Sequence, residues 1–358
     1  MPDAEGPRGR RGFLRLGGGA ALAALLPYGR PRAAAGDYLA GERLRVVIAS
    51  DAGSGNDAVA RLFTEHLRPL LPDTEITLEN IGGGGGRLAE KLLFESPPDG
   101  LTIAFLRSSM FYRILYAPQD YPYDLSSFSW LGSLSRERRV LLTTLKSGIV
   151  DLESLRAFDG PVRLALDSVS ATSYQEALYL NVMLGTRLTP VPGYDGGGRN
   201  LAILNGEVEG RIANYESVLP LIEAGAATIA LRINGTPLPP PFEGVALLHE
   251  LPIDPQYDWL RRVMQAEADL GRIVAAAPGV PPERLQRLTE LFFAVAGDPD
   301  FRAAALGMGL LVEPRDGATL QAGFAELPPR SAETVAKLEA MKACGLRLAE
   351  GAAGCAAP

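Results

Sequence analysis

Short apolar runs that end in glycine-rich or polar loops recur along the first third of the chain. Each of the first two loops leads into a stretch with apolar positions at helical spacing, residues 58–70 and 87–94. The runs and their loops are residues 43–50 with loop 51–57, residues 75–79 with loop 82–86, and residues 101–106 with Arg107 and Ser108. The pattern predicts three parallel strands whose carboxyl ends share one edge of a sheet.

Similar runs beyond residue 139 predict a second lobe and then a return to the first. They lie at 140–144, 162–166, 208–213 and 228–233. A further strand at 273–277 and helices at 282–296, 301–306 and 318–346 should pack on the first lobe. The predicted organisation is a signal peptide 1–35, a first lobe made of residues 36–138 and 235–350, a second lobe of residues 139–234, and a tail of residues 351–358.

The N-terminus has the features of a twin-arginine export signal. Arg10-Arg11-Gly12-Phe13-Leu14 precedes an apolar stretch at 16–28, and Ala33-Ala34-Ala35 supplies a small-residue cleavage site. The apolar stretch is interrupted by three glycines and is shorter than the roughly 20 residues that span a bilayer. A membrane anchor or a disordered basic tail would explain these features less completely. We therefore expect export to the periplasm.

Composition narrows the possible functions. Without residues 1–35 the chain has 29 basic and 40 acidic side chains, a net charge of −11, which argues against nucleic-acid and anionic-membrane partners. Its length favours two lobes, and we expect a monomer. Only two histidines are present, which removes most metal-site and catalytic-triad hypotheses. Cys344 and Cys355 could form one bridge or remain two free thiols.

Glycine loops at the carboxyl ends of parallel strands are natural anion receptors. Their N–H groups converge, and each following helix directs the positive end of its dipole at the same space. Four such loops, two per lobe, are residues 51–57, 82–86, 167–173 and 190–198. A purely structural role in turns explains one such loop better than four. The hydroxyls of Ser168, Ser170, Thr172 and Ser173 have no activating base and are interpreted as hydrogen-bonding and capping groups.

Two enzymatic alternatives can be formulated from the same residues. Gly53-x-Gly55-x-x-Ala58 after a strand, with Glu79 at the end of the next strand, matches a dinucleotide-binding fingerprint. The glycine run directly after Glu79 and the export signal argue against it. A serine hydrolase would need a base, and neither His66 nor His249 follows a strand end.

Five groups of motifs follow one another in the order and spacing of a known family. They are Asp51 to Asp57 with Ala60-Arg61, Glu79-Asn80-Ile81 with Gly82 to Gly86, Pro98-Asp99-Gly100-Leu101-Thr102 with Tyr123-Asp124 and Phe128, Val191-Pro192-Gly193-Tyr194, and Leu204-Asn205-Gly206-Glu207-Val208-Glu209. Through them the chain resembles the periplasmic substrate-binding receptors of tripartite tricarboxylate transporters, also called Bug-type receptors. The resemblance covers most of the chain after residue 35.

The resemblance implies an α/β protein with the two-lobed, type II-like periplasmic binding fold and a ligand cleft between the lobes. It implies a receptor rather than an enzyme, without cofactor or metal, that delivers a small carboxylated solute to the permease subunits of a tripartite transporter. Backbone amides, hydroxyls and waters would hold the solute. By position, the binding residues would be Ser54, Gly55, Asn56, Asp57, Gly83, Gly84, Gly85, Gly86, Arg107, Ser108, Ser170, Thr172, Tyr194, Gly197 and Asn214.

Several positions depart from the family pattern, so the solute can differ from the ordinary dicarboxylate or citrate. The departures are Asp51 or Ala52 in place of proline, Arg107 in place of a small residue, Asp195 in place of lysine, and Ala213 in place of aspartate. Arg107, Arg199 and Arg211 are each either a partner for a solute carboxylate or an ordinary salt-bridged arginine. The leading hypothesis is a solute receptor that closes about hinges near 138–142 and 228–236. An exported nucleotide-cofactor oxidoreductase and a ligand-sensing partner of a signalling receptor are the alternatives.

Overall fold

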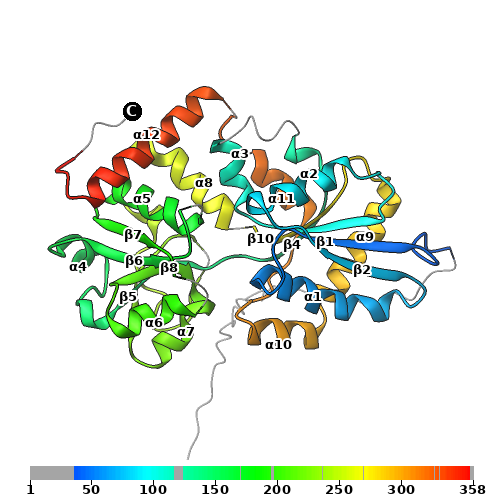
Figure 1. The fold of residues 1–358 in the computed structure, drawn as a ribbon, viewed down its shortest axis with the longest axis horizontal. Coiled ribbons are helices and arrows are strands. Elements are labelled where there is room, and N and C mark those ends of the chain that lie inside the picture. The colour runs from blue at the N-terminus through cyan, green and yellow to red at the C-terminus, as the bar shows by residue number, and fades with distance from the viewer. Residues whose placement is uncertain are drawn as a thin grey trace, which may run out of the picture.

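The computed structural model describes residues 36–116, 124–169, 171–194, 197–235, 237–268, 270–325, 327–329 and 331–354. They form two lobes, each with its own mixed sheet and covering helices, so the predicted two-lobed α/β fold is confirmed (Figure 1). The predicted signal segment lies outside the described residues, as do Ser170 and Asp195.

The sheet of the first lobe has six strands in the order β11-β4-β10-β3-β1-β2. β1 is parallel to β2 and β3, whereas β10 runs antiparallel between β3 and β4. The carboxyl ends of β1, β2 and β3 therefore share an edge with the amino end of β10. The bounds are β1 Arg43–Ile48, β2 Glu75–Asn80, β3 Thr102–Leu106, β4 Ser129–Ser135, β10 Gly271–Ala276 and β11 Arg315–Asp316.

The sheet of the second lobe has five strands in the order β7-β6-β8-β5-β9. β6 is parallel to β7 and β8, and β5 is antiparallel to both β8 and β9. The carboxyl ends of β6, β7 and β8 thus lie beside the amino end of β5. The bounds are β5 Arg139–Thr144, β6 Val162–Leu166, β7 Leu188–Pro192, β8 Gly210–Asn214 and β9 Ala227–Arg232.

Helices cover both faces of each sheet (Figure 1). One face of the first sheet carries α1 Gly55–Leu67, α9 Pro282–Ala296 and α10 Pro299–Gly307, and the other carries α2 Arg87–Glu95, α3 Met110–Tyr116 and α11 Gly317–Ala325. In the second lobe, α4 Leu152–Ala157 and α5 Thr172–Leu184 oppose α6 Gly198–Asn205 and α7 Tyr215–Glu223. The remaining helices are α8 Asp258–Ala268 and α12 Ala332–Ala349.

The apolar core forms between the sheets and the helices that cover their faces. Phe63 on α1 contacts the rings of Phe105, Phe292 and Phe301, with centroids 5.2 to 5.9 Å apart, and so joins α1, α9 and α10 to the first sheet. A second cluster runs without interruption from Phe111 on α3, through α8 and α12, to the second lobe. The lobes are therefore joined by packed apolar side chains along one side as well as by the backbone.

Two neighbouring backbone segments cross between the lobes. One leads from β4 to β5 and the other leaves β9. The N–H of Ile233 donates to the carbonyl of Arg139 (2.9 Å), and the Asn234 side chain accepts from the Arg139 N–H (2.9 Å). The segments predicted as hinges, 138–142 and 228–236, adjoin these crossings but lie largely within β5 and β9. Hinge motion itself stays a prediction.

The C-terminal region differs from the prediction in two respects. The expected single helix at 318–346 is two helices, α11 and α12, because Pro328 and Pro329 between them remove backbone donors and break helical geometry. We expected both to pack on the first lobe. α11 does, but α12 packs chiefly against α5 of the second lobe, where the Asn181 side chain donates to the Gly345 carbonyl (3.1 Å). The chain therefore crosses between the lobes a third time.

Helix α12 is the longest described helix, with 18 residues. Cys344 lies on its buried side and is disulfide-bonded; Cys355 lies outside the described residues. Across the described ranges, no helix combines the length and apolar character needed to cross a membrane.

Candidate functional site

The strand ends that carry the predicted binding loops meet at the boundary between the lobes. Asp167 at the end of β6 is close enough to Arg107 at the end of β3 for their charges to interact across that boundary. We call the residues at these ends, together with Arg211 from the first half of β8, the interlobe site. It comprises residues 50–57 and 81–86, Arg107, Ser108 and Arg272 of the first lobe, and Arg139, Asp167, residues 197–200, Arg211 and Asn214 of the second.

The first loop is held in shape by the carboxylate of Asp57. The Gly53 N–H donates to Asp57 Oδ2 (2.8 Å), while Asn80 Nδ2 (2.9 Å) and Arg61 Nε (2.8 Å) contact Oδ1. Burial alone would raise the pKa of Asp57, but the hydrogen bonds from Arg61, Asn80 and Gly53 hold that pKa below its usual value. Asp57 is thus an ionised brace whose acceptor atoms are occupied by the protein itself.

The first turn of α1 carries the donors that this loop can offer to a solute. Ser54 caps the helix by accepting from the Asp57 N–H, while the N–H groups of Gly55 and Asn56 have no acceptor within the described part of the chain. The Asn56 side chain is buried; its Nδ2 donates to the Phe105 carbonyl (3.3 Å) and its Oδ1 has no partner. Two backbone donors therefore remain available at the positive end of a 13-residue helix.

The second loop takes a path that requires glycine. Gly83, Gly84, Gly85 and Gly86 all have positive φ, from 54° to 109°. A Cβ on Gly82 would lie 1.9 Å from the Asp51 carboxylate oxygen, so the two loops lie side by side. The run of glycines is a backbone requirement of this turn, and it brings the loop's N–H groups next to the first loop.

Arg107 directly follows the last residue of β3 and has no partner in the part of the chain that the structure describes. Its side chain is exposed and makes no hydrogen bond or ion pair with the described residues. Desolvation by the surrounding protein lowers the pKa of Arg107, and the like charges of Arg113 and Arg272 lower it further. Arg107 is thus open to water yet surrounded by protein atoms. A side chain in the wall of a concave site has these surroundings.

Arg272, at the amino end of β10, is a site residue that sequence reasoning missed. It is the one non-glycine with positive φ (55°) in the described ranges, and its Nε is buried without a partner. Its Nη1 lies 3.6 Å from the Glu137 carboxylate, and its Nη2 lies against Gly55 of the first loop. Only the antiparallel direction of β10 brings it here. No local motif signals that direction.

Two of the second-lobe arginines in the site, Arg199 and Arg139, are already paired. Arg199, in the first turn of α6, donates to Asp167. Arg139, at the start of β5, donates from Nε to Glu176 (3.0 Å) and from Nη1 to Asn214 (3.1 Å). The Asn214 side chain, predicted to contact a solute, is thus held at the site by an arginine.

The structure gathers most of the predicted residues at this boundary, and their role in binding stays a prediction. Ser108 is buried at the turn into α3, Gly197 precedes α6, and Thr172 begins α5. Tyr194 is the exception, because its hydroxyl donates to Glu207 beyond the far end of α6 (3.4 Å) and so points away from Asp167. Ser170 lies outside the described residues.

The residue that a dinucleotide-binding site would need is engaged elsewhere. Glu79 would have to reach ribose hydroxyls, but its carboxylate accepts from Arg45 Nε at 2.8 Å in an ion pair on the surface of the sheet. Arg45 lies on the neighbouring strand, so this pair belongs to the sheet. No feature of Glu79 favours a ribose-binding role.

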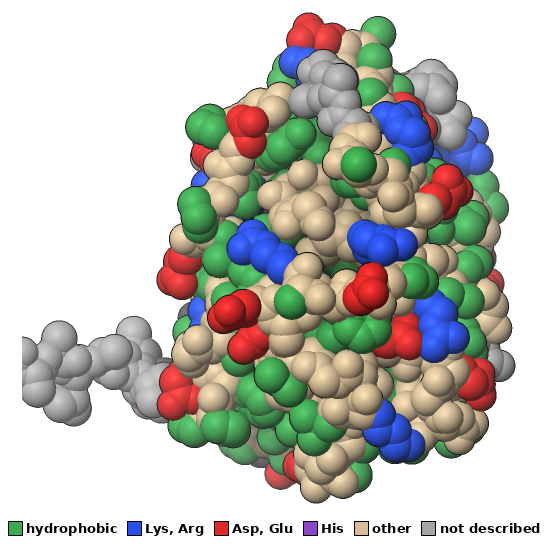
Figure 2. Space-filling model, turned by 90° about the vertical axis from the view of Figure 1, so that its left-hand side faces the viewer, with side chains coloured by type: hydrophobic (Ala, Val, Ile, Leu, Met, Phe, Trp, Pro, Cys, Tyr) green, Lys and Arg blue, Asp and Glu red, His purple; other side chains and the backbone are tan. Residues whose placement is uncertain are grey.

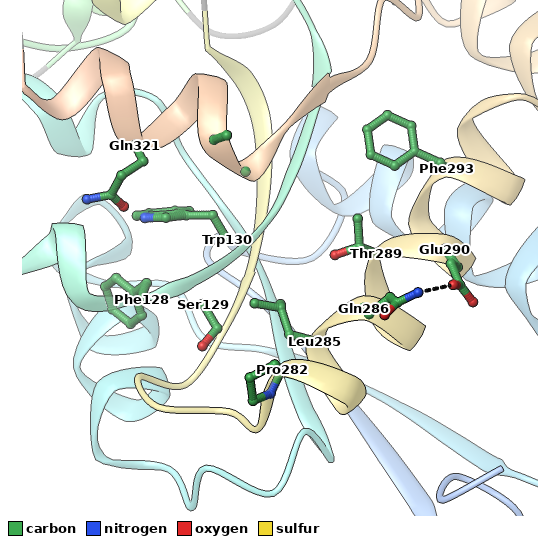
Figure 3. A pocket seen from close by; sticks show the side chains of 12 residues that line it. Phe128, Ser129, Trp130, Pro282, Leu285, Gln286, Thr289, Glu290, Phe293 and Gln321 are labelled. Carbon is green, nitrogen blue, oxygen red and sulfur yellow. Dashed lines mark hydrogen bonds between the residues drawn. The ribbon is translucent and has the colours of Figure 1, made fainter. Parts of the chain in front are cut away.

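A pocket of about 730 Å³ lies elsewhere, between α9, α11 and the start of β4 (Figure 3). Its walls include Trp130, Leu285, Thr289, Phe293 and Gln321. Because β4 is parallel to β3, its amino end is at the opposite edge of the sheet from Arg107. The pocket is therefore remote from every predicted binding loop, and we do not consider it a solute site.

The outer face of the second lobe carries charges of both signs (Figure 2). Basic and acidic side chains are interspersed there with apolar and neutral ones, and neither sign forms a broad patch. This face therefore lacks the broad basic patch that binds a polyanion.

Solved structures share this fold. A TctC solute-binding protein from Polaromonas has a TM-score of 0.66 at 17% identity, covering 84% of this chain and 97% of that one. MatC from Rhodopseudomonas palustris, solved with malate, has a TM-score of 0.58 at 21% identity, with 84% and 99% coverage. A second R. palustris protein, solved with adipate, has a TM-score of 0.58 at 18% identity, with 86% and 97% coverage.

Sequence comparison gives the same assignment. A UPF0065 protein of Cupriavidus necator is 25% identical over 299 residues, which is 82% of this chain and 86% of that protein. The model of the tripartite tricarboxylate transporter family receptor matches residues 59–310. That match covers the whole second sheet, strands β2, β3, β4 and β10 of the first, and the two neighbouring segments that cross between them. The predicted resemblance is confirmed, and the chain belongs to the tripartite tricarboxylate transporter receptor family.

Proposed function

We propose that this protein is a periplasmic receptor that binds a small carboxylate-bearing solute between its lobes and delivers it to the membrane subunits of a tripartite transporter. The observation that carries the proposal is a group of unused donors at one strand edge. Two glycine loops and the start of α1 place N–H groups there beside the Arg107 guanidinium, and neither those of Gly55 and Asn56 nor Arg107 has a partner among the described residues. Backbone donors and a cation at one strand edge form a receptor for a carboxylate.

Family membership supports the transport role, and the relatives solved with malate and adipate support an organic acid as solute. In this role the protein performs no chemistry on the solute. Closure would exclude water and strengthen each charged contact.

Mass spectrometry of small molecules released from the purified mature protein is the most direct test. A thermal-shift panel of mono-, di- and tricarboxylates and aromatic acids should then show stabilisation by the acid that co-purifies, since a bound ligand raises stability with its concentration. If no organic acid is recovered and none raises the melting temperature, the proposal is wrong.

Replacing Arg107 by alanine should weaken binding of that acid at least about tenfold. The melting temperature of the free protein should stay unchanged, because the side chain has no partner to lose among the described residues. Titration calorimetry and thermal melts measure the two effects. Arg43→Ala is the matched control, since Arg43 lies at the opposite end of β1 and pairs with Glu75 (2.9 Å). Equal affinities for Arg107→Ala and wild type would contradict a binding role for Arg107.

We also propose that residues 1–35 direct export by the twin-arginine route. Changing Arg10 and Arg11 together to lysine should leave uncleaved protein in the cytoplasm, because that route reads the arginine pair. Fractionation followed by immunoblotting measures the distribution. Normal periplasmic accumulation of the double variant would show that another route is used.

A further inference from the structure

Among the described residues, Arg211 is a buried cation without a carboxylate partner. It lies on β8 of the second lobe and is 7% exposed. Its Nη1 donates to the Asn200 side chain (2.7 Å), while its Nε is buried with no acceptor. The unused donors, Nε and Nη2, form the edge of a guanidinium that can bind a carboxylate through two parallel hydrogen bonds.

The neighbours of Arg211 do not neutralise it. Burial lowers its pKa to about 10, and the like charges of Arg199 and Arg139 contribute to that shift, so Arg211 is still protonated at neutral pH. The nearby carboxylates are shared, since Asp167 accepts from Arg199 and Glu176 accepts from Arg139. A buried charge left without a counter-ion is strongly unfavourable, and ionisable groups perturbed in this way cluster at functional sites.

A second unpaired guanidinium lies on the other lobe. Arg107 has no ion-pair partner among the described residues, whereas Arg113 is paired with Glu90 and Arg272 with Glu137. Asp167 lies near enough to act electrostatically on both Arg107 and Arg211. The two unpaired cations therefore flank the same stretch of the boundary, one from each lobe.

Asp51 is the one unpaired carboxylate of the first loop. It is exposed and lies against Gly82. Among the described residues it forms no hydrogen bond or ion pair with Arg107 or Arg211, so it does not pair with either cation.

We propose that Arg107 and Arg211 bind the two anionic groups of the solute directly, one from each lobe, so that the receptor selects doubly charged over singly charged acids. The inference rests on the proposed function and adds to it the residues that set charge selectivity. Each lobe supplies one unmatched positive charge, and a dianion that links them is bound fully only when both lobes contact it. Closure and selection thus depend on the same pair of contacts.

Arg211→Met separates this role from a structural one. The variant keeps most of the apolar stem of the side chain and removes the charge. The free protein should melt at the same temperature as wild type or higher, because an uncompensated buried charge has been removed. Its affinity for dicarboxylates should fall about 100-fold. Arg163→Met, which removes an outward-facing arginine of the same lobe paired with Glu209 (2.6 Å), is the matched control and should bind like wild type.

The probes are succinate, glutarate and adipate, each beside the monocarboxylate of equal chain length, with methylphosphonate, measured at about pH 8.5 where it carries two charges, as a compact dianion. Wild type should prefer one of the diacids to its monoacid by about 100-fold, and Arg211→Met should lose that preference. Equal binding of a monoacid and its diacid, preference for methylphosphonate, or unchanged affinity in Arg211→Met would overturn the inference. A melting temperature of free Arg211→Met well below wild type would also overturn it, by showing a structural role. If no acid binds wild type, the proposed function itself fails.

Discussion

Gly345→Ala is expected to lower the free energy of unfolding by about 2 kcal/mol. The added Cβ would lie 2.3 Å from the carbonyl oxygen of Leu178, an atom of the α5 backbone that has no rotamer with which to move aside. Helix propensity favours alanine by about 1 kcal/mol, but overpacking costs typically 1–3 kcal/mol, and the forced retreat of α12 also weakens the hydrogen bond from Asn181. Urea unfolding followed by circular dichroism measures the net effect.

Gly307→Ala is the matched control for this prediction. Gly307 ends α10, its φ is not positive, and a Cβ there meets no atom within 4 Å. Its stability should be unchanged or higher by about 0.5 kcal/mol. If Gly345→Ala behaves like Gly307→Ala, α12 is not seated on α5 as closely as described.

Asp57→Ala should destabilise the protein by about 3 kcal/mol and reduce acid binding more than tenfold. The substitution leaves the donors of Gly53 and Asn80 without their acceptor and removes the ion pair with Arg61, which releases the first loop. Chemical denaturation and calorimetry measure the two losses. Asp73→Asn, at an exposed position of the same lobe, serves as control. A variant that kept full affinity would show that the loop holds its shape without the brace.

The stability that Asp57 contributes should decrease as the pH falls. Its native pKa is below the ordinary value of 3.8, so the ionised form is the one stabilised by folding. Its contribution is complete above about pH 5 and is lost as the pH falls through the native pKa. The stability difference between wild type and Asp57→Asn should therefore shrink below about pH 4. A difference that stays constant from pH 7 to pH 3 would contradict an ionised brace.

The sequence pattern located the strands whose composition is strongly apolar and β-branched. The run at 162–166 matches β6, and those at 43–50 and 75–79 match β1 and β2 to within two residues. β4 was missed because three of its seven residues are serines, although all seven are buried. Burial there comes from the sheet and helices around β4, which a local pattern does not contain. For the same reason the contact between α12 and α5 was not predicted.

The candidate site was predictable where a loop follows a strand directly. Gly83 to Gly86 could be placed because a glycine run directly after a strand indicates a tight loop. Their positive φ values agree with that prediction. Arg272 could not be placed, because its position depends on β10 running antiparallel after a long excursion through the second lobe. The absence of a counter-ion at Arg211 is likewise a property of packing that sequence spacing does not encode.

The third crossing has a mechanical consequence. Helix α12 starts beside α3 of the first lobe, yet most of its length lies on α5, and its 18 residues span about 27 Å. In a closing rotation it would travel with the second lobe, pivoting near its first turn, and a rotation of about 20° would displace its far end by roughly 9 Å. The position of the helix on the outer surface would therefore differ between the open and the closed molecule. A membrane partner could then distinguish a loaded from an empty receptor by its outline, without contacting the solute.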